Sequence, residues 1–500
     1  MRLDVLQLWQ HAWPSLTLLI AAMVSLLTSV FPSRHRARIT AVLAATAFLL
    51  SAQGFFHQWG LGEAKGFEFL VVDPLSNYLG ALIALIGFIT SIAAYPYILS
   101  QAEAIPEFFS LLLFAAFGMT TMVMTTNLLA FVLGLEIMSL SLYVLVGLRR
   151  YDPRSGEAAF KYFLLGSVAT AFLLFGISFF YGSTGTLDLS RIPELLPNPE
   201  MATLFKLGAL LILLGFAFKV GAVPFHFWAP DVYDGAPMPV TGFMATGVKV
   251  AAFGALIRVV EAFAPRHELP LQRWIVMLSF ATMIVGNLVA LRQRHLKRIL
   301  AYSSIAHAGY LLLGMATLVG TGEIRAAALS PILFYLLVYS LLTLGVFSVL
   351  TILSSGGQEL NDLKDLDGLS EKRPVLSAVL SVFFISLAGV PPTAGFLAKY
   401  YLFSQAIQVG LYPLAIAGIL ASAVSLYYYL GPIVRMYFHS HEKTWQAPGV
   451  MASLRLLLAL MVAGVFYLGL FPASTLEISR RTVPIRALEA PLASPSAKLP

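Results

Sequence analysis

About fourteen stretches of roughly 20 apolar residues recur along this chain, and they constrain its fold more than any other feature. A helix of that length crosses the hydrocarbon core of a bilayer with its backbone groups hydrogen-bonded internally. The stretches centre near residues 22, 47, 87, 116, 137, 170, 213, 249, 282, 309, 340, 385, 425 and 461. Of the 500 residues, 58% are hydrophobic and only 11% are charged, too few polar groups to cover a soluble domain. The sequence therefore predicts an all-α polytopic membrane protein with about 14 transmembrane helices.

The basic residues are divided unequally between the two sets of loops. Loops after odd-numbered helices hold fifteen Lys and Arg residues, among them Arg34, Arg149 and Lys364. Loops after even-numbered helices and their flanks hold seven, among them Lys65 and Arg273. Because cytoplasmic loops carry the excess of Lys and Arg, both termini are expected outside the cytoplasm. The net charge of +7 needs no nucleic-acid partner to explain it.

Two of the apolar runs are interrupted. The seventh breaks around AVPFHFWAP, at Pro224, and the twelfth breaks around SLAGVPPTAGF, at Gly389, Pro391 and Pro392. Irregular backbone at membrane depth persists only where protein or a water-filled cavity surrounds it, because lipid cannot satisfy the freed backbone groups. We therefore expect both breaks to lie beside polar interiors.

The two breaks lie five helices apart and indicate an internal repeat of helices 4–8 and 9–13. Lys249 follows Lys219 by 30 residues, and Tyr429 follows Lys399 by the same interval. Because each repeat holds an odd number of helices, the second is expected to be inverted, as in many transporters. The predicted domains are residues 1–105 for helices 1–3, 106–265 for the first repeat, 266–440 for the second, and 441–500 for helix 14 and the C-terminal tail.

Ionisable residues lie inside these apolar runs, where charge is costly. The set comprises Glu136, Lys161, Lys219, Lys249, His307 and Lys399, of which Lys161 lies nearest a helix end. Buried charges that only fix helix packing are the alternative interpretation, but apolar residues would pack there without the electrostatic cost. A lysine whose proton affinity depends on a nearby carboxylate can load and release a proton, and histidine can donate and accept. The set therefore predicts a path for protons.

Other kinds of site find little support in the sequence. There are no cysteines, so this chain has no disulfide and no thiolate ligand for a metal or an iron–sulfur cluster. His226 and Asp231 are too few for a metal cage. No phosphate-binding loop, dinucleotide fingerprint or serine–histidine motif is present, so we expect no metal and no cofactor in this chain. The charged segment Gly356 to Arg373 is expected to be a solvated loop.

Three motifs carry a family resemblance. They are KVGAVPFHFWAPDVYDGAPMPVTGF from Lys219, LKRILAYSSIAHAGYLLLG from Leu296, and SLAGVPPTAGFLAKYYLF from Ser386. Together they resemble the subunit N family of bacterial NADH-quinone oxidoreductase, respiratory complex I, and the resemblance covers nearly the whole chain. It implies a proton-translocating, antiporter-like membrane-arm subunit in the bacterial inner membrane, with both termini periplasmic. The two repeats would then be two antiporter-like half-channels.

The resemblance also implies roles for the buried residues. Glu136 and Lys219 resemble the glutamate–lysine pair of the first half-channel, Lys249 the connecting lysine and Lys399 the terminal lysine. His307 and Lys161 are assigned to the same central axis. The family works as part of a translocase whose NADH, FMN, iron–sulfur clusters and quinone are bound by other subunits.

The expected partners are the other complex I membrane subunits, including the sister antiporter-like subunits, and the lipid bilayer. Two alternatives stay open from the sequence. One is a subunit of an Mrp-like cation/proton antiporter, where a WLP-led motif would be expected in place of WAPDVYDGAP. The other is a membrane scaffold that conducts nothing.

Overall fold

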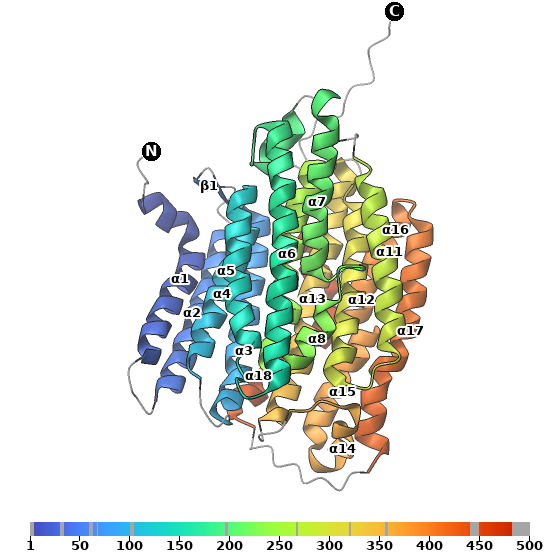
Figure 1. The fold of residues 1–500 in the computed structure, drawn as a ribbon. Helices are drawn as coiled ribbons and strands as arrows, with labels where there is room; N and C mark the ends of the chain where they lie inside the picture. Colours follow the sequence, from blue (N-terminus) through green and yellow to red (C-terminus); the bar gives the residue numbers. More distant parts are fainter. Residues whose placement is uncertain are drawn as a thin grey trace, which may run out of the picture.

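The protein is a bundle of roughly parallel helices (Figure 1). A computed structural model describes residues 5–30, 35–59, 64–67, 69–100, 105–195, 199–266, 269–319, 322–355, 359–440 and 450–482. The first part contains α1 (Val5–Val30), α2 (Arg36–Gln58), β1 (Ala64–Phe67), β2 (Leu70–Val72) and α3 (Pro74–Ser100). The next contains α4 (Glu107–Val123), α5 (Leu128–Val146), α6 (Pro153–Thr184), the 3-10 turns η2 (Leu189–Glu194) and η3 (Pro199–Met201), α7 (Ala202–Val220), α8 (Trp228–Gly235), α9 (Met238–Phe243), the π-helical turn η4 (Met244–Val248) and α10 (Lys249–Phe263).

The second half of the chain continues the same pattern. It contains α11 (Leu271–Ala290), α12 (Leu296–Thr317), α13 (Gly322–Ser354), the 3-10 turn η5 (Leu363–Leu366), α14 (Leu369–Lys372), α15 (Pro374–Ala388), α16 (Ala394–Gln408), α17 (Tyr412–Phe438), α18 (Ala452–Leu470) and α19 (Pro472–Arg481). Among the described residues, 12 helical segments are long and apolar enough to cross a membrane. Two further apolar helices, α4 and α15, have 17 and 15 residues.

The predicted fold class is confirmed: the chain is a helical, multi-pass membrane protein. Every predicted centre of an apolar run lies inside one of these helices. The sequence did not indicate the antiparallel hairpin in which β1 pairs with β2 between α2 and α3. The total of about fourteen spans, the repeats and the four domain boundaries stay predictions.

Both predicted breaks are present, and they are built alike. Helix α7 ends at Gly221 and α15 ends at Gly389, whose φ angles of 73° and 86° are left-handed and suit glycine. Pro224 lies in the turn between α7 and α8, and Pro391 and Pro392 lie between α15 and α16. In Figure 1, α7 lies above α8, whereas α15 lies below α16, so the two broken helices run in opposite directions.

The centre of the bundle is formed by α10, α12 and α13. Their membrane-crossing windows are 89 to 100% buried, compared with 33 to 39% for α6, α11, α17 and α18 at the rim. A buried ion pair helps to hold α10 in place, because Arg258 donates to both carboxylate oxygens of Asp73, at 2.8 and 2.9 Å, and also to the carbonyl of Val123. Side chains on these central helices are therefore shielded from lipid.

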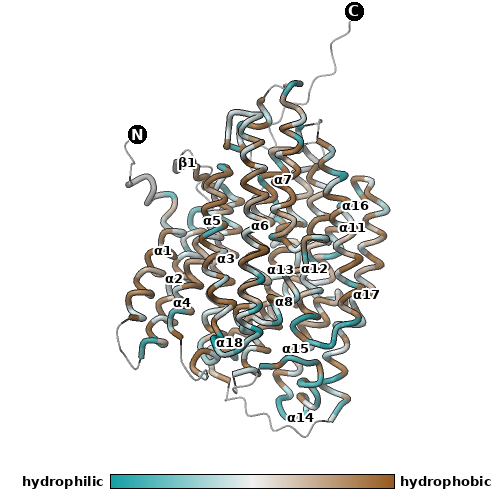
Figure 2. The backbone as a smooth tube through the Cα atoms, in the orientation of Figure 1, coloured by the Kyte–Doolittle hydropathy of each residue, from teal (hydrophilic) through white to brown (hydrophobic). Residues whose placement is uncertain are grey.

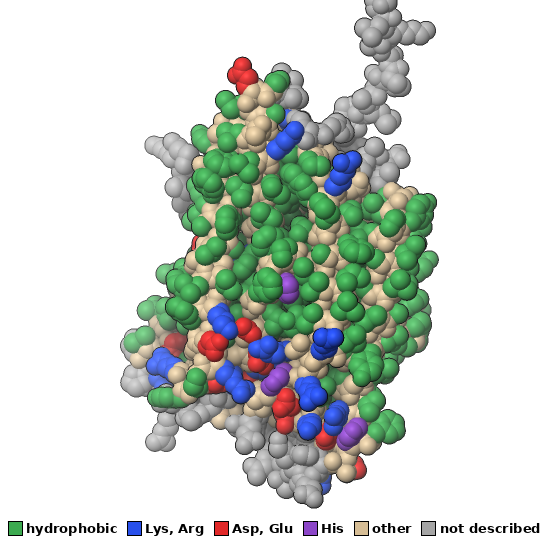
Figure 3. Space-filling model, turned by 45° about the vertical axis from the view of Figure 1, so that its right-hand side comes forward, with side chains coloured by type: hydrophobic (Ala, Val, Ile, Leu, Met, Phe, Trp, Pro, Cys, Tyr) green, Lys and Arg blue, Asp and Glu red, His purple; other side chains and the backbone are tan. Residues whose placement is uncertain are grey.

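Charge collects at one end of the bundle, which we call the charged end; it includes α14 and the start of α6 and α12. Figure 2 shows apolar residues along the middle of most helices and hydrophilic residues around α14. On the face drawn in Figure 3, apolar side chains cover most of the height, and Lys, Arg, Asp and Glu gather near the lower end. This distribution matches a bundle that lies across a bilayer with its charged end in water.

Candidate functional site

Lys219 lies in the last turn of α7, directly before the first break. Its side chain is 4% exposed, and its Nζ donates to Ser139 Oγ on α5 at 2.9 Å. The carboxyl end of a helix carries partial negative charge, which favours a cation there. The break therefore places the ammonium group of Lys219 in the interior of the bundle. Its polar neighbours there are the carboxyl end of α7 and the hydroxyl of Ser139.

Glu136 lies on α5, one turn before Ser139. Thr170 on α6 donates to its Oε1 at 2.8 Å. Among the described residues, Glu136 and Lys219 form no direct ion pair; the hydroxyl that binds Lys219 belongs to Ser139, one turn further along α5. The Glu136 side chain is only half-buried, and Leu133 and Leu140 on the same flank of α5 are 60% and 55% exposed. The carboxylate is thus bound to α6 and lies near the outer flank of the bundle.

Lys249 is the first residue of α10 and follows the π-helical turn η4. Its Nζ donates to the carbonyl of Ser304 on α12 and, at 2.7 Å, to the hydroxyl of the same residue. It also lies 4.7 Å from the ring centroid of Tyr339 on α13. Turns of π-helix inside α-helices occur often at functional sites. The three central helices therefore meet at this lysine.

His307 lies three residues beyond Ser304 on α12. Its Nδ1 is 2.6 Å from Tyr335 Oη and its Nε2 is 2.9 Å from Tyr429 Oη. Tyr429 is also hydrogen-bonded to Ser303. A neutral imidazole that is bonded through both nitrogens donates on one side and accepts on the other, which is the property that a relay requires.

Lys399 lies on α16, beyond the second break. Its Nζ donates to the carbonyl of Ala388, at the end of α15, at 3.0 Å, and to Ser422 Oγ on α17 at 2.9 Å. His307 and Lys399 line one small cavity of about 10 Å³, close to what a single water molecule needs. The structure thus brings Lys399 and His307 to a shared space.

The second break depends on a close approach of backbone at Gly395. A Cβ atom at this position would lie 1.8 Å from the carbonyl oxygen of Ser386, and backbone cannot move aside cheaply. We expect Gly395→Ala to destabilise the protein by about 1 to 3 kcal/mol, the usual cost of overpacking. Thermal unfolding of the purified complex measures this. Gly431→Ala is the control, because a Cβ there meets nothing within 4 Å; equal melting temperatures for the two variants would refute the explanation.

The structure places Lys161 apart from the other predicted residues. Its side chain is 40% exposed and pairs with Glu157 at 2.7 Å and with Asp231 at 2.8 Å, at the charged end. Asp231 also pairs with Arg298 at 2.7 Å. No contact joins Lys161 to Lys219 within the part of the chain that the structure describes. A role for Lys161 in the central axis stays a prediction.

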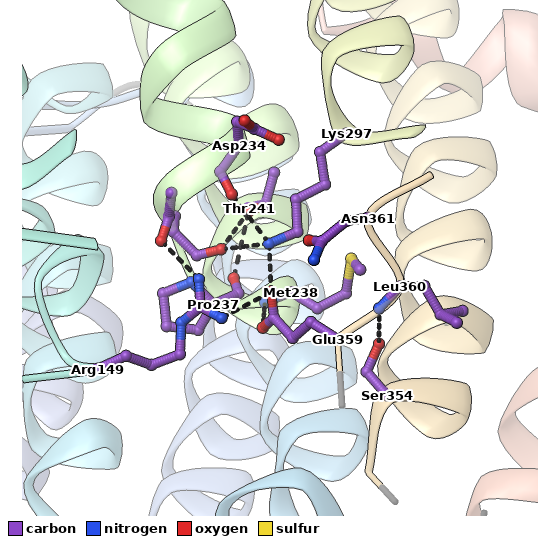
Figure 4. A network of polar contacts seen from close by, with 12 residues as sticks. Arg149, Asp234, Pro237, Met238, Thr241, Lys297, Ser354, Glu359, Leu360 and Asn361 are labelled. Atoms are coloured by element: carbon purple, nitrogen blue, oxygen red, sulfur yellow. Dashed lines mark hydrogen bonds and ion pairs between the residues drawn. The ribbon is translucent and has the colours of Figure 1, made fainter. Parts of the chain in front are cut away.

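The charged end contains a buried ion cluster that is not predicted from the sequence (Figure 4). The Glu359 side chain is 7% exposed, so the expectation of a solvated loop is wrong at this residue. Its carboxylate accepts hydrogen bonds from Tyr97 at 2.6 Å and from the backbone NH of Met238 at 3.1 Å. It also forms ion pairs with Lys297 and, at 3.1 Å, with Arg149. Four segments that are distant in sequence therefore converge on one carboxylate.

The same cluster holds the turn between α8 and α9. Lys297 donates to the carbonyls of Asp234 and Ala236 at 3.2 and 2.8 Å, and Arg149 donates to the carbonyl of Gly235 at 2.9 Å. Two cations thus cap the carboxyl end of α8, where the helix dipole favours them. Burial alone would raise the pKa of the Glu359 carboxyl, but the charges of Lys297 and Arg149 and the hydrogen bonds outweigh it and lower the pKa. No local pattern marks Glu359, because its partners come from other parts of the chain.

We call the four most buried predicted residues, Lys219, Lys249, His307 and Lys399, the row, in their order along the chain; Lys161 lies apart from them at the charged end. Lys219, Lys249, His307 and Lys399 are each only 4 to 5% exposed. Each binds hydroxyl groups or main-chain carbonyls, and within the described residues none of the three lysines has a carboxylate within ion-pair distance. A buried amine with neutral partners can be held with or without its proton, since no fixed anion demands the charge.

The chain matches a known family of membrane subunits. The family model described as "NADH:quinone oxidoreductase/Mrp antiporter, TM" matches residues 125–425. NADH-quinone oxidoreductase subunit N of Trichlorobacter lovleyi is 39% identical over 491 residues, which cover 97% of this chain and 99% of that protein. The corresponding subunit N 1 of Sorangium cellulosum is 42% identical over 472 residues, covering 90% and 91% of the two chains.

Solved structures show the same fold. A chain of respiratory complex I from Thermus thermophilus with bound aureothin has a TM-score of 0.79 and 34% identity, covering 93% of this chain and 98% of that chain. A chain of the Mrp complex from Dietzia sp. has a TM-score of 0.81 but only 20% identity, covering 96% and 97%. The fold therefore does not separate the two kinds of complex, whereas the sequence is closer to the first.

Proposed function

This chain belongs to the NADH:quinone oxidoreductase/Mrp antiporter membrane family, and from that premise we propose that it is the proton-translocating subunit N of an NADH-quinone oxidoreductase. The relatives at 39% and 42% identity carry that name over nearly their full length, which supports this assignment within the family. In this proposal NADH oxidation and quinone reduction occur in other subunits, which hold the FMN and the iron–sulfur clusters. This chain contributes the passage of protons.

The observation that carries the proposal is the buried row of titratable groups from Lys219 through Lys249 and His307 to Lys399. Buried charges are expensive at membrane depth, where each costs about 2.5 to 3.5 kcal/mol on insertion scales. Four such groups on four different helices, each bonded to hydroxyl or carbonyl oxygens, are poorly explained by packing. A route for protons explains why titratable groups are retained at these buried positions.

In this mechanism quinone reduction elsewhere causes a rearrangement along the membrane arm that changes the separation of Glu136 and Lys219. Bringing the carboxylate closer favours the ammonium form of the lysine, and withdrawing it favours release of the proton. The proton passes to Lys249, then through His307 to Lys399 and outward. In this mechanism the break beside Lys219 and the break beside Lys399 admit water where a continuous helix would exclude it.

Glu136 points to a neighbouring subunit as a partner. Its half-buried carboxylate lies on the outer flank of α5 between exposed leucines at positions 133 and 140. Lipid against this flank would leave a charge in hydrocarbon, whereas another membrane subunit can cover it and supply polar contacts. We place a membrane-arm neighbour, such as a sister antiporter-like subunit, on this face.

The orientation follows from the distribution of charge. We place the charged end, with Lys161, Lys297 and Arg298, in the bacterial cytoplasm and both termini in the periplasm, since cytoplasmic ends carry the excess of Lys and Arg. The membrane is then the inner membrane of the cell. The Mrp-type alternative shares the fold, but the relative from such a complex is only 20% identical.

Replacing Lys399 by alanine tests the function. We expect NADH-driven proton translocation by the purified complex in liposomes to fall at least about tenfold, equivalent to 1.4 kcal/mol on the barrier. The matched control is Lys372→Ala, which removes an exposed cation at the charged end. Unchanged translocation by Lys399→Ala would contradict the proposal. A complex that exchanges sodium for protons without oxidising NADH would favour the Mrp-type alternative.

A further inference from the structure

Tyr162 on α6 is a fully buried tyrosine beside Lys219, the first residue of the row. Its side chain is 0% exposed. Its ring stacks on Trp228 of α8, with centroids 5.0 Å apart, and meets the edge of Tyr143 on α5 at 4.8 Å. The Nζ of Lys219 lies 5.8 Å from the centre of the same ring. Tyr162 therefore contacts the helices that surround the first break.

The hydroxyl of Tyr162 has no hydrogen-bond partner among the described residues. A buried polar group left unpaired costs about 1 to 3 kcal/mol, so phenylalanine would fill the same space with less loss of stability. The ring contacts with Trp228 and Tyr143 need no hydroxyl. Packing alone therefore does not account for a tyrosine at this position.

The position of this hydroxyl supplies the missing explanation. Trp228, on which the Tyr162 ring stacks, also meets the edge of the Tyr233 ring, with centroids 6.4 Å apart. Tyr233 Oη lies 3.5 Å from Ser304 Oγ, and that oxygen accepts a hydrogen bond from Lys249 at 2.7 Å. Tyr162 beside Lys219 and Tyr233 beside Ser304 thus both pack on Trp228, between Lys219 and Lys249, which share no direct contact in the described part of the chain.

We infer that Tyr162 relays protons from Lys219 to Lys249, with Tyr233 and Ser304 as the next carriers and water molecules bridging the gaps. This inference rests on the function proposed above. In one transfer the ammonium of Lys219 gives up a proton, and each hydroxyl oxygen along the way accepts one proton and releases its own. The neutral amine of Lys249 accepts the last one. Lys219 ends neutral, Lys249 ends charged, no hydroxyl is consumed, and no oxidant or reductant is needed.

Tyr162→Phe in the assembled complex tests the relay. We expect NADH-driven proton translocation in liposomes to fall about tenfold or more. This is less than the loss of about 10² to 10⁴-fold that is typical of removing a positioned proton-transfer group. We expect assembly and thermal stability to be equal to those of the parent or higher, because an unpaired hydroxyl is removed. We also expect a larger solvent deuterium isotope effect on quinone reduction, which a residue that only packs would not change.

Tyr78→Phe is the matched control. Tyr78 is also buried, but its hydroxyl donates to the carbonyl of Leu333 at 3.2 Å and lies outside the row. This variant loses a real hydrogen bond, so stability should drop while translocation per electron stays unchanged. Tyr233→Phe provides a second test of the same relay, and it decides the question if Tyr162→Phe assembles poorly.

The outcomes separate this inference from the proposed function. If the Tyr162→Phe variant translocates protons at the parent rate while the Lys249→Met variant is inactive, the relay is overturned and the proposed function stands. Full translocation by both variants overturns the function and the relay with it. Loss of translocation in Tyr162→Phe with intact assembly, an increased isotope effect and a normal Tyr78→Phe control supports the relay.

Discussion

Replacing Lys249 by methionine is expected to stop proton translocation while leaving the protein as stable as before or more so. Methionine has a similar length and fills the space without bringing a charge into the interior, and replacing buried charges by apolar residues is often neutral or stabilising. Ser304 keeps a partner, because Tyr339 still donates to its hydroxyl at 2.9 Å. The rate should fall about 10² to 10⁴-fold, as for other positioned proton-transfer groups.

The measurement for Lys249→Met combines two readouts from one preparation. Proton uptake or release by liposomes reports translocation, and thermal unfolding of the purified complex reports stability. Lys364→Ala, which removes an exposed cation at the charged end, is the control and should change neither. A variant that pumps at the parent rate would show that Lys249 is only a packing residue. A variant that is inactive because it fails to assemble would contradict the expected stability.

Replacing Glu359 by alanine is expected to have the largest effect on stability. The substitution leaves Lys297, which is fully buried, and Arg149 without their shared carboxylate. Breaking a buried ion pair by removing one partner costs about 3 to 5 kcal/mol. Tyr97 and the backbone NH of Met238 also lose their acceptor. We therefore expect a marked fall in the melting temperature of the complex and weak retention of this subunit.

The pH dependence of this contribution follows from the lowered pKa of Glu359. A carboxyl group with a lower pKa in the folded state stabilises the protein above its unfolded pKa, and the contribution is lost as the pH falls through the folded value. At neutral pH the full effect of Glu359→Ala should therefore be measurable. An exposed neighbour in the same segment provides the control, since Lys364→Ala should cost less than about 1 kcal/mol. Equal stability of the two variants would refute the buried cluster.

The helices and the two breaks could be predicted from the sequence because both depend on the chemistry of neighbouring residues. An apolar run of bilayer length has few alternatives to a helix, and clustered glycine and proline favour an interruption, although Gly431 and Pro432 lie inside the continuous helix α17. Gly221 and Gly389 end α7 and α15 in the left-handed conformation that glycine adopts freely. The short strands β1 and β2 gave no such signal, since three or four residues hold too little periodicity to read.

The buried titratable residues could also be recognised from the sequence, but their partners could not. Lys249 stands out in an apolar run by its residue type alone. Its bond to Ser304 joins residues 55 apart in the sequence, and the bond between Glu359 and Tyr97 joins residues 262 apart. Such pairs depend on how helices pack, which no local pattern encodes. For the same reason the sequence does not show that Lys161 pairs with Asp231, which lies 70 residues away at the charged end.

Two of the three lysines of the row bind main-chain carbonyl oxygens. Lys249 donates to the carbonyl of Ser304, and Lys399 donates to the carbonyl of Ala388, at the end of α15. Every amino acid carries such an oxygen, so residue 388 can drift through evolution, or be varied in a mutant library, without deleting this acceptor. Screens that vary side chains therefore do not detect the contribution of this main-chain acceptor. Only changes that move the backbone, at the glycines and prolines of the break, can remove it.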